Sequence, residues 1–106
     1  MSVFFMVAGN AITDLSMMEL QKLLQAAGIE SSLENDELAL KGQASVYFRD
    51  SFDHEYIIVG DAQDAPTLIK ISTCLSHCLT QHGIEHEFEI YDTQNLVIHD
   101  IKSPAE

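Results

Sequence analysis

The sequence predicts an α+β fold in which pseudo-duplicated β-α-β-β units form one mixed or antiparallel sheet with two helices on one face. Two amphipathic stretches have helical spacing, and short segments with strand patterns flank each of them. Each helical stretch ends in the same tripeptide, Gly-Ile-Glu, at 28–30 and at 83–85. With 106 residues, 46% of them hydrophobic, the chain has the size of one compact domain, and we expect a single domain over 1–106.

The first element is expected to be a central strand. The run Val3-Phe4-Phe5-Met6-Val7-Ala8 is continuously apolar, which is typical of a strand buried on both faces. Glycine and asparagine are common in turns, so Gly9-Asn10 is expected to end the strand.

A helix and a hairpin are expected next. Thr13 or Asp14 can cap the helix at its start, and Gly28 can end it. Residues 30–41 alternate in hydropathy around Asn35-Asp36, which predicts a short hairpin. The apolar face of the helix is expected to comprise Leu20, Leu23, Leu24 and Ala27.

A half-buried strand over 44–50 is expected to link the two halves of the chain. Ala44, Val46 and Phe48 alternate there with polar or amphipathic residues. The next segment, Asp50-Ser51-Phe52-Asp53-His54-Glu55, is expected to be an acidic turn.

The second half, 55–101, is expected to repeat the first. Tyr56-Ile57-Ile58-Val59 predicts another strand buried on both faces, which ends at Gly60-Asp61. Asp64 can cap a long helix that Gly83 ends, and 84–101 has the alternation of a hairpin that turns at 92–95. The apolar stripe of this helix is expected to comprise Leu68, Ile71, Leu75, Cys78, Leu79 and His82, with His82 partly buried.

The predicted pseudo-repeat comprises 1–43 and 55–101, with the linking strand at 44–50. The two units agree in element order and in the tripeptide that ends each helix. The order β-α-β-β-β-α-β-β resembles ferredoxin-like domains, the paired βαβββ modules of the vicinal oxygen chelate enzymes and the small acidic chaperones of type III secretion. The sequence contains no motif that favours one of these families.

The charge balance narrows the class of partner. Acidic residues number 17 against 5 basic ones, which gives a net charge of −12, and Arg49 is the single arginine. Nucleic acid and anionic membranes need clustered lysine and arginine, so neither is an expected partner. A negative field attracts a basic protein, a basic peptide or a divalent cation, although acidity also serves solubility alone.

The chain is expected to lie in the cytoplasm with reduced thiols. It has no apolar run of the length of a membrane span and no N-terminal pattern of a secretory signal. Cys74 and Cys78 are four residues apart on the second helix, where disulfide geometry is rarely reached.

A ligand site is a second interpretation, with Asn10, Asp61 and Asp64 in the two strand-to-helix loops as its residues. Turn formation and helix capping explain the same residues. The chain contains no phosphate-binding glycine loop, no Gly-x-Ser-x-Gly elbow and no zinc motif, so no cofactor is expected and a non-enzymatic role is favoured.

Metal binding is a third interpretation. His77, Cys78, His82 and His86 are spaced so that they diverge from one another, so no metal site is expected there. The acidic turn at 50–55 is the alternative for a divalent ion, although its order differs from that of an EF-hand loop.

The terminal hairpin carries the main hypothesis. With the turn centred on Thr93-Gln94, the expected cross-strand pairs are Ile90 with Val97, Phe88 with His99, Glu89 with Ile98, and Glu87 with Asp100. Glu85, Glu87, Glu89 and Asp100 would then form an acidic ridge beside Tyr91, Leu96 and Ile98. Such a ridge fits a basic partner, and it also fits a plain solvated sheet face.

We therefore expect a small acidic cytoplasmic interaction protein that binds a basic protein or peptide, as an adaptor, an immunity-like inhibitor or a secretion chaperone does. It would act alone or as a homodimer built on sheet edges or faces. The alternatives are a small enzyme or ligand-binding domain that uses the Gly60–Asp64 loop, and a divalent-metal-binding protein. The residues expected to bind the partner are Glu85, Glu87, Glu89, Tyr91 and Asp100.

Overall fold

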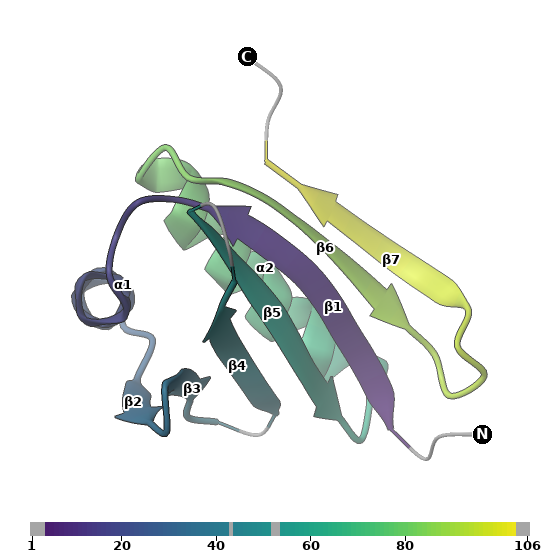
Figure 1. The fold of residues 1–106 in the computed structure, drawn as a ribbon. Helices are drawn as coiled ribbons and strands as arrows, with labels where there is room; N and C mark the ends of the chain where they lie inside the picture. Colours follow the sequence, from purple (N-terminus) through teal and green to yellow (C-terminus); the bar gives the residue numbers. More distant parts are fainter. Residues whose placement is uncertain (1–3, 43, 52–53, 104–106) are drawn as a thin grey trace.

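The computed structural model describes residues 4–42, 44–51 and 54–103. All of its strand pairs are antiparallel. Seven strands form one sheet in the order β2-β3-β4-β5-β1-β6-β7, and two helices accompany it (Figure 1). The predicted α+β class is confirmed, and of the two predicted kinds of sheet the antiparallel one is found.

The centre of the sheet joins segments that are far apart in the sequence. β1 (Phe5–Ile12) pairs along its full length with β5 (Glu55–Ala62). β6 (Glu85–Tyr91) lies on the other side of β1, and β4 (Ser45–Asp50) lies on the other side of β5.

Local hairpins form the two ends of the sheet. β2 (Ser31–Glu34) and β3 (Glu37–Leu40) turn at Asn35 and Asp36, whose positive φ angles of 49° and 63° suit the tight turn predicted there. β7 (Val97–Lys102) returns along β6 and forms the opposite edge.

Both helices lie on the same face of the sheet. α2 (Ala65–Gln81) crosses behind β6, β1 and β5 in the view of Figure 1. α1 (Met17–Ala26) packs beside α2 over the β2–β3 hairpin. The face that is turned toward the viewer in Figure 1 therefore carries no helix, and we call it the open face.

The core lies between the sheet and the helices, so the central strands are buried on one face only. Along β5, Tyr56 and Ile58 are buried whereas Ile57 is exposed, and β1 alternates in the same way. The prediction that both strands are buried on two faces is wrong, because the apolar side chains of the open face have no covering layer. The largest fully buried side chains include Phe48, Phe88, Leu20, Leu24, Leu38, Ile58, Leu68 and Leu75.

Two glycines expected in turns lie within strands instead. A Cβ atom on Gly9 would collide with the carbonyl oxygen of Glu87, and one on Gly60 would collide with that of Ser45. The neighbouring strand leaves no room for a side chain at either glycine, and β1 continues past Gly9 to Ile12 as β5 continues past Gly60 to Ala62.

The helix ends agree with the sequence except at the start of α1. Asp64 caps α2 as predicted, and the stops at Gly28 and Gly83 have φ angles of 83° and 68°. The cap of α1, however, is Ser16, whose hydroxyl accepts from the Glu19 N–H while its own N–H donates to the Glu19 carboxylate in a capping box.

The buried stripe of α2 also differs from the prediction. Ser72 and Ser76, which lie outside the predicted apolar stripe, are buried, whereas His82 is exposed at the C-cap. The buried histidine is His86 on β6.

The structure does not show the pseudo-duplication. β6, which follows α2, pairs with the central strand β1, whereas β2, which follows α1, lies at the sheet edge and is separated from β5 by β3 and β4. The two units share element order, but the strands that follow their helices occupy different places.

Candidate functional site

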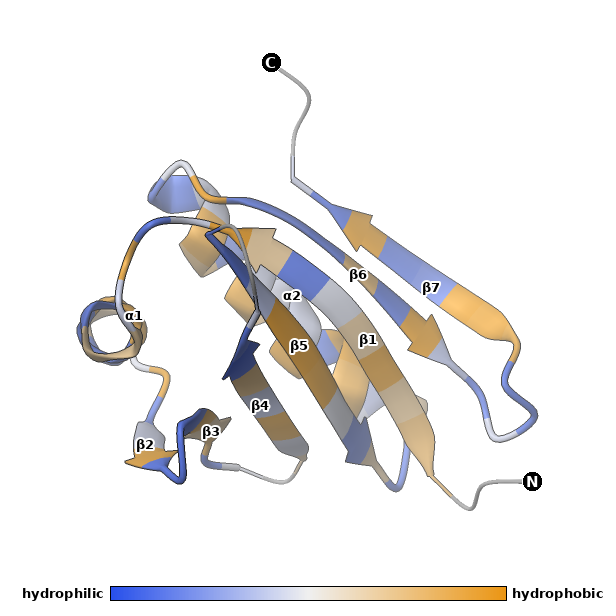
Figure 2. Ribbon diagram, viewed as in Figure 1, coloured by the Kyte–Doolittle hydropathy of each residue, from blue (hydrophilic) through white to orange (hydrophobic). Residues whose placement is uncertain are grey.

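The open face has an apolar centre. Met6 and Ile12 on β1 and Ile57 on β5 are 42%, 44% and 40% exposed, and Val59 lies half-buried among them. Figure 2 shows hydrophobic residues along much of β1 and β5 at the centre of the sheet, and both hydrophilic and hydrophobic residues along β6. We call Met6, Ile12, Ile57 and Val59 the apolar strip.

Carboxylates border the apolar strip on the β6 side. His86, Phe88 and Ile90 point into the core, so the alternate residues of β6 point to the open face. Asp100 on β7 is the cross-strand partner of Glu89 and shares its face. We call Glu85, Glu87, Glu89 and Asp100 the acidic patch.

The acidic patch and the apolar strip lie side by side on neighbouring strands, with Glu87 opposite the polar Asn10 between them. Glu85 lies opposite Ile12 across the β6–β1 pair, and Glu89 lies opposite Ala8, whose other neighbour is Val59 on β5. Tyr91 continues the row on β6 and lies opposite Met6. A partner placed over this border would therefore contact negative and apolar side chains together.

The pairing of the terminal hairpin differs by two residues from the prediction. Ile90 pairs with His99 and Phe88 with Ile101. The loop is wider than expected, with the Asp92 N–H donating to the Leu96 carbonyl, and a bulge follows at Ile90/Tyr91. From His99 to Lys102 the shift of two leaves each side chain on its predicted face, because side chains alternate with a period of two. Beyond the bulge the shift is one, so Val97 lies opposite Tyr91 rather than opposite the core-facing Ile90.

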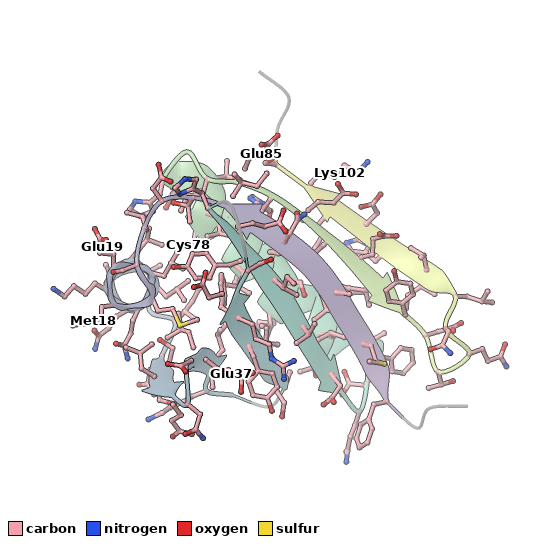
Figure 3. All side chains as sticks on the ribbon, in the orientation of Figure 1. Met18, Glu19, Glu37, Cys78, Glu85 and Lys102 are labelled. Atoms are coloured by element: carbon pink, nitrogen blue, oxygen red, sulfur yellow. The ribbon has the colours of Figure 1, made fainter. Side chains whose placement is uncertain are left out.

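The shift changes which charges meet. Glu87 lies opposite Lys102, with 3.9 Å between the lysine Nζ and a carboxylate oxygen, rather than opposite Asp100. Glu85 and Lys102 lie at the same end of the β6–β7 pair in Figure 3. The remaining close pair of carboxylates is Glu89 with Asp100.

The open face as a whole is negative. Its two basic side chains among the described residues each adjoin a carboxylate: Arg49 bonds to Glu37, and Lys102 lies near Glu87. Read from the strand register, the carboxylates on this face are Glu34, Glu37, Glu55, Asp61, Glu85, Glu87, Glu89 and Asp100.

A hollow of about 720 Å³ adjoins the acidic patch. Glu85 and Glu87 line it together with Thr80 at the end of α2 and Ser103 after β7. Lys102 also lines it, and the carboxylate and hydroxyl oxygens of its walls can accept hydrogen bonds from a lysine or arginine side chain.

The residues of the alternative ligand site do not converge. Asn10 lies within β1 opposite Ile57, and Asp61 lies within β5 opposite Met6, so four positions of β1 separate them. Asp64 accepts a hydrogen bond of 2.8 Å from the Thr67 N–H, which holds the pKa of its carboxyl below the usual range. The predicted strand-to-helix loops thus consist largely of strand, and Asp64 has a capping role.

One buried polar pair was missed by the sequence reasoning. Ser76 Oγ lies 2.6 Å from His86 Nε2, and His86 Nδ1 lies 2.9 Å from the Ile84 carbonyl oxygen. Since a carbonyl only accepts, Nδ1 carries the proton and Nε2 accepts the Ser76 hydroxyl. This pair joins α2 to β6. The sequence analysis did not find it, because Ser76 lies outside the predicted apolar stripe.

The histidines and cysteines do not form a metal centre. Across the described ranges, no group of three or more His, Cys, Asp or Glu side chains could hold a metal ion. The acidic turn at 50–55 includes Phe52 and Asp53, which lie outside the described residues, and His54 there pairs with Asp14. Cys74 is exposed, whereas Cys78 is buried, and burial raises the pKa of the Cys78 thiol.

Comparison of the chain with protein-family models, with curated proteins and with solved structures found no match. Neither helix of the described segments has the length and apolar character that a membrane crossing requires. The site is therefore interpreted from its own geometry.

Proposed function

We propose that this protein is a small acidic interaction module that binds a basic protein partner on the open face of its sheet. The observation that carries the proposal is the shared border of the acidic patch and the apolar strip, where Glu85 adjoins Ile12 and Glu89 adjoins Ala8. Apolar contacts would hold the complex, and charge would select the partner and speed association.

The net charge of −12 supports a partner of opposite sign. Long-range attraction brings a basic protein to an acidic surface faster than diffusion alone and repels acidic competitors. The hollow beside Glu85 and Glu87 offers a place for a lysine or arginine of the partner. A cytoplasmic location is part of the proposal, and the two free thiols suit a reducing compartment.

The proposed partner surface comprises Glu85, Glu87, Glu89, Tyr91 and Asp100, extended by the apolar strip. Tyr91 lies opposite Met6 across the β6–β1 pair, so its ring adds to the apolar border. As an adaptor, an immunity-like inhibitor or a secretion chaperone, the protein would use this surface to mask its basic partner.

The test compares two triple variants of equal charge. E85Q/E89Q/D100N removes three carboxylates from the acidic patch, and E30Q/D36N/D50N removes three exposed carboxylates elsewhere. A partner is first captured from lysate at low salt and identified, and its affinity for each variant is then measured by calorimetry.

The proposal expects a basic partner that is released as salt rises, because screening weakens exposed charges. The patch variant should bind about tenfold more weakly or worse, and the control variant should bind nearly as well as the parent chain. Equal binding by both variants would overturn the proposal. Sedimentation of the free chain reports whether a second copy occupies the face instead.

A further inference from the structure

The two edges of the sheet differ in how far they are protected from further pairing. β2 has four residues and lies beside α1. β7 has six residues, and Figure 1 shows it as the outermost strand on its side. Within the described part of the chain, no strand pairs with its outer edge.

β7 carries a bulge and two charged residues, Asp100 and Lys102, but part of its outer edge is regular and has no covering element in the described part of the chain. Val97 and Ile98 are exposed β-branched residues, which favour strand pairing. The bulge lies at the end of β7 that holds these two residues, and pairing with β6 is regular from His99 to Lys102. An open edge of this length is a template for another strand.

The main-chain groups at the free edge follow from the ladder on the other side. The Ser103 N–H donates to the His86 carbonyl at 2.9 Å, so the residues in phase with Ser103, namely Ile101 and His99, turn their main-chain groups toward β6. The intervening residues, Asp100 and Lys102, therefore direct N–H and C=O outward. Each can form two hydrogen bonds with an added strand.

The side chains at this edge specify what kind of strand would fit. On the open side β7 presents Asp100 next to Glu89 and Lys102 next to Glu87, so an added strand would meet carboxylates at the Asp100 position. Ile101 lies on the helix side and is only partly buried against the core, so apolar side chains of the added strand would complete its burial.

We propose that the basic partner presents an extended segment with alternating basic and apolar residues, and that this segment pairs with β7 as an eighth strand. Its basic residues would lie on the open face beside Asp100 and Glu89, and its apolar residues would lie beside Ile101. This inference rests on the proposed function, because it names the form in which the basic partner is recognised.

The test uses three synthetic peptide designs, the third made in two versions, and the full chain. The first alternates lysine with valine, the second alternates glutamate with valine, and the third is the lysine peptide with its alternate amides N-methylated so that one edge cannot donate. Both N-methylation phases are made, since either set of amides could face β7. Affinity is measured by calorimetry at low and moderate salt.

The inference expects the lysine peptide to bind, the glutamate peptide not to bind, and one N-methylation phase to weaken binding about tenfold or more. Binding that is salt-sensitive but unchanged by both N-methylation phases would overturn strand addition and leave the proposed function in place. Lysine and glutamate peptides that bind equally would count against both. Binding by neither peptide would overturn strand addition.

A matched pair of variants tests the same edge from the side of the protein. Asp100→Asn and Asp100→Pro both remove the charge, but only the proline lacks the outward N–H, and proline is tolerated at a free strand edge. The proline variant should bind the lysine peptide about tenfold more weakly than the asparagine variant, with circular dichroism confirming that both fold. Equal affinities, or a dimer of the free chain that Asp100→Pro dissociates, would overturn the proposed occupant.

Discussion

The two faces of the sheet are made of the same strands but have different roles. On the covered face Ile58 of β5 is fully buried, and on the open face its neighbour Ile57 is 40% exposed. The side chains of the covered face have a partner within the chain, so folding explains them. Nothing in the described part of the chain covers the apolar strip, and the proposed partner is what would cover it.

The largest effect is expected in a comparison of two adjacent residues of β5. Ile58→Ala should lower the free energy of unfolding by about 2–5 kcal/mol, because it leaves a cavity in the core. Ile57→Ala should lower it by less than about 1 kcal/mol, because water already reaches that side chain. Urea denaturation of both variants gives the two values. Similar losses would show that the open face also stabilises the fold.

The second test concerns Gly9, where β6 leaves no room for a side chain on β1. Gly9→Ala would place a methyl group against the carbonyl of Glu87 and the ring of Phe88, so we expect a loss of about 1–3 kcal/mol. Ala8→Ser, one residue away on the open face, serves as the control and should change stability little. Thermal unfolding distinguishes the two variants. An unchanged midpoint for Gly9→Ala would mean that β1 and β6 can move apart enough to accept a methyl group.

A third test addresses the polar pair beneath the covered face. Ser76→Ala leaves the buried Nε2 of His86 without a donor, which should cost about 1–3 kcal/mol. Thr73→Ala, at an exposed position of α2, is the matched control and should be nearly neutral. Nitrogen chemical shifts of His86 would report its tautomer. A shift pattern with the proton on Nε2 would contradict the hydrogen-bond directions derived above.

The sequence predicted the order of the elements, because each depends on neighbouring residues. The cap at Asp64, the turn at Asn35-Asp36 and the stops at Gly28 and Gly83 all act within a few positions of the chain. Long-range pairing explains what was missed. The role of Gly9 depends on Glu87, which is remote in the sequence, and the wider terminal loop and its bulge moved Glu87 from Asp100 to Lys102.

The candidate site was predictable in part for the same reason. Alternation along one strand placed Glu85, Glu87 and Glu89 on a common face. This prediction holds because it does not depend on how β6 pairs with β7, where the predicted register was wrong. The apolar strip was missed because a run such as Tyr56-Ile57-Ile58-Val59 has the same pattern whether one face or both are covered. Which faces are covered depends on where the helices pack, and the sequence of a single strand does not contain that information.

The smallest effect is expected outside both faces, at the start of α2. The hydrogen bond from the Thr67 N–H lowers the pKa of Asp64 from its usual 3.8, so the folded chain binds fewer protons there than the unfolded chain does. The carboxylate therefore contributes stability that is fully present above that usual value and is lost as pH falls through the lower folded-state pKa. Asp64→Asn keeps a side-chain oxygen for the cap but does not titrate.

The stability difference between the parent chain and Asp64→Asn should thus be small near neutral pH and should shrink further in acid. Denaturant midpoints measured for both chains from neutral pH to below 3.8 would show this convergence. The two chains differ at this position alone, so the difference isolates Asp64. A difference that persists unchanged through that range would mean that the negative charge of Asp64 does not stabilise the helix start.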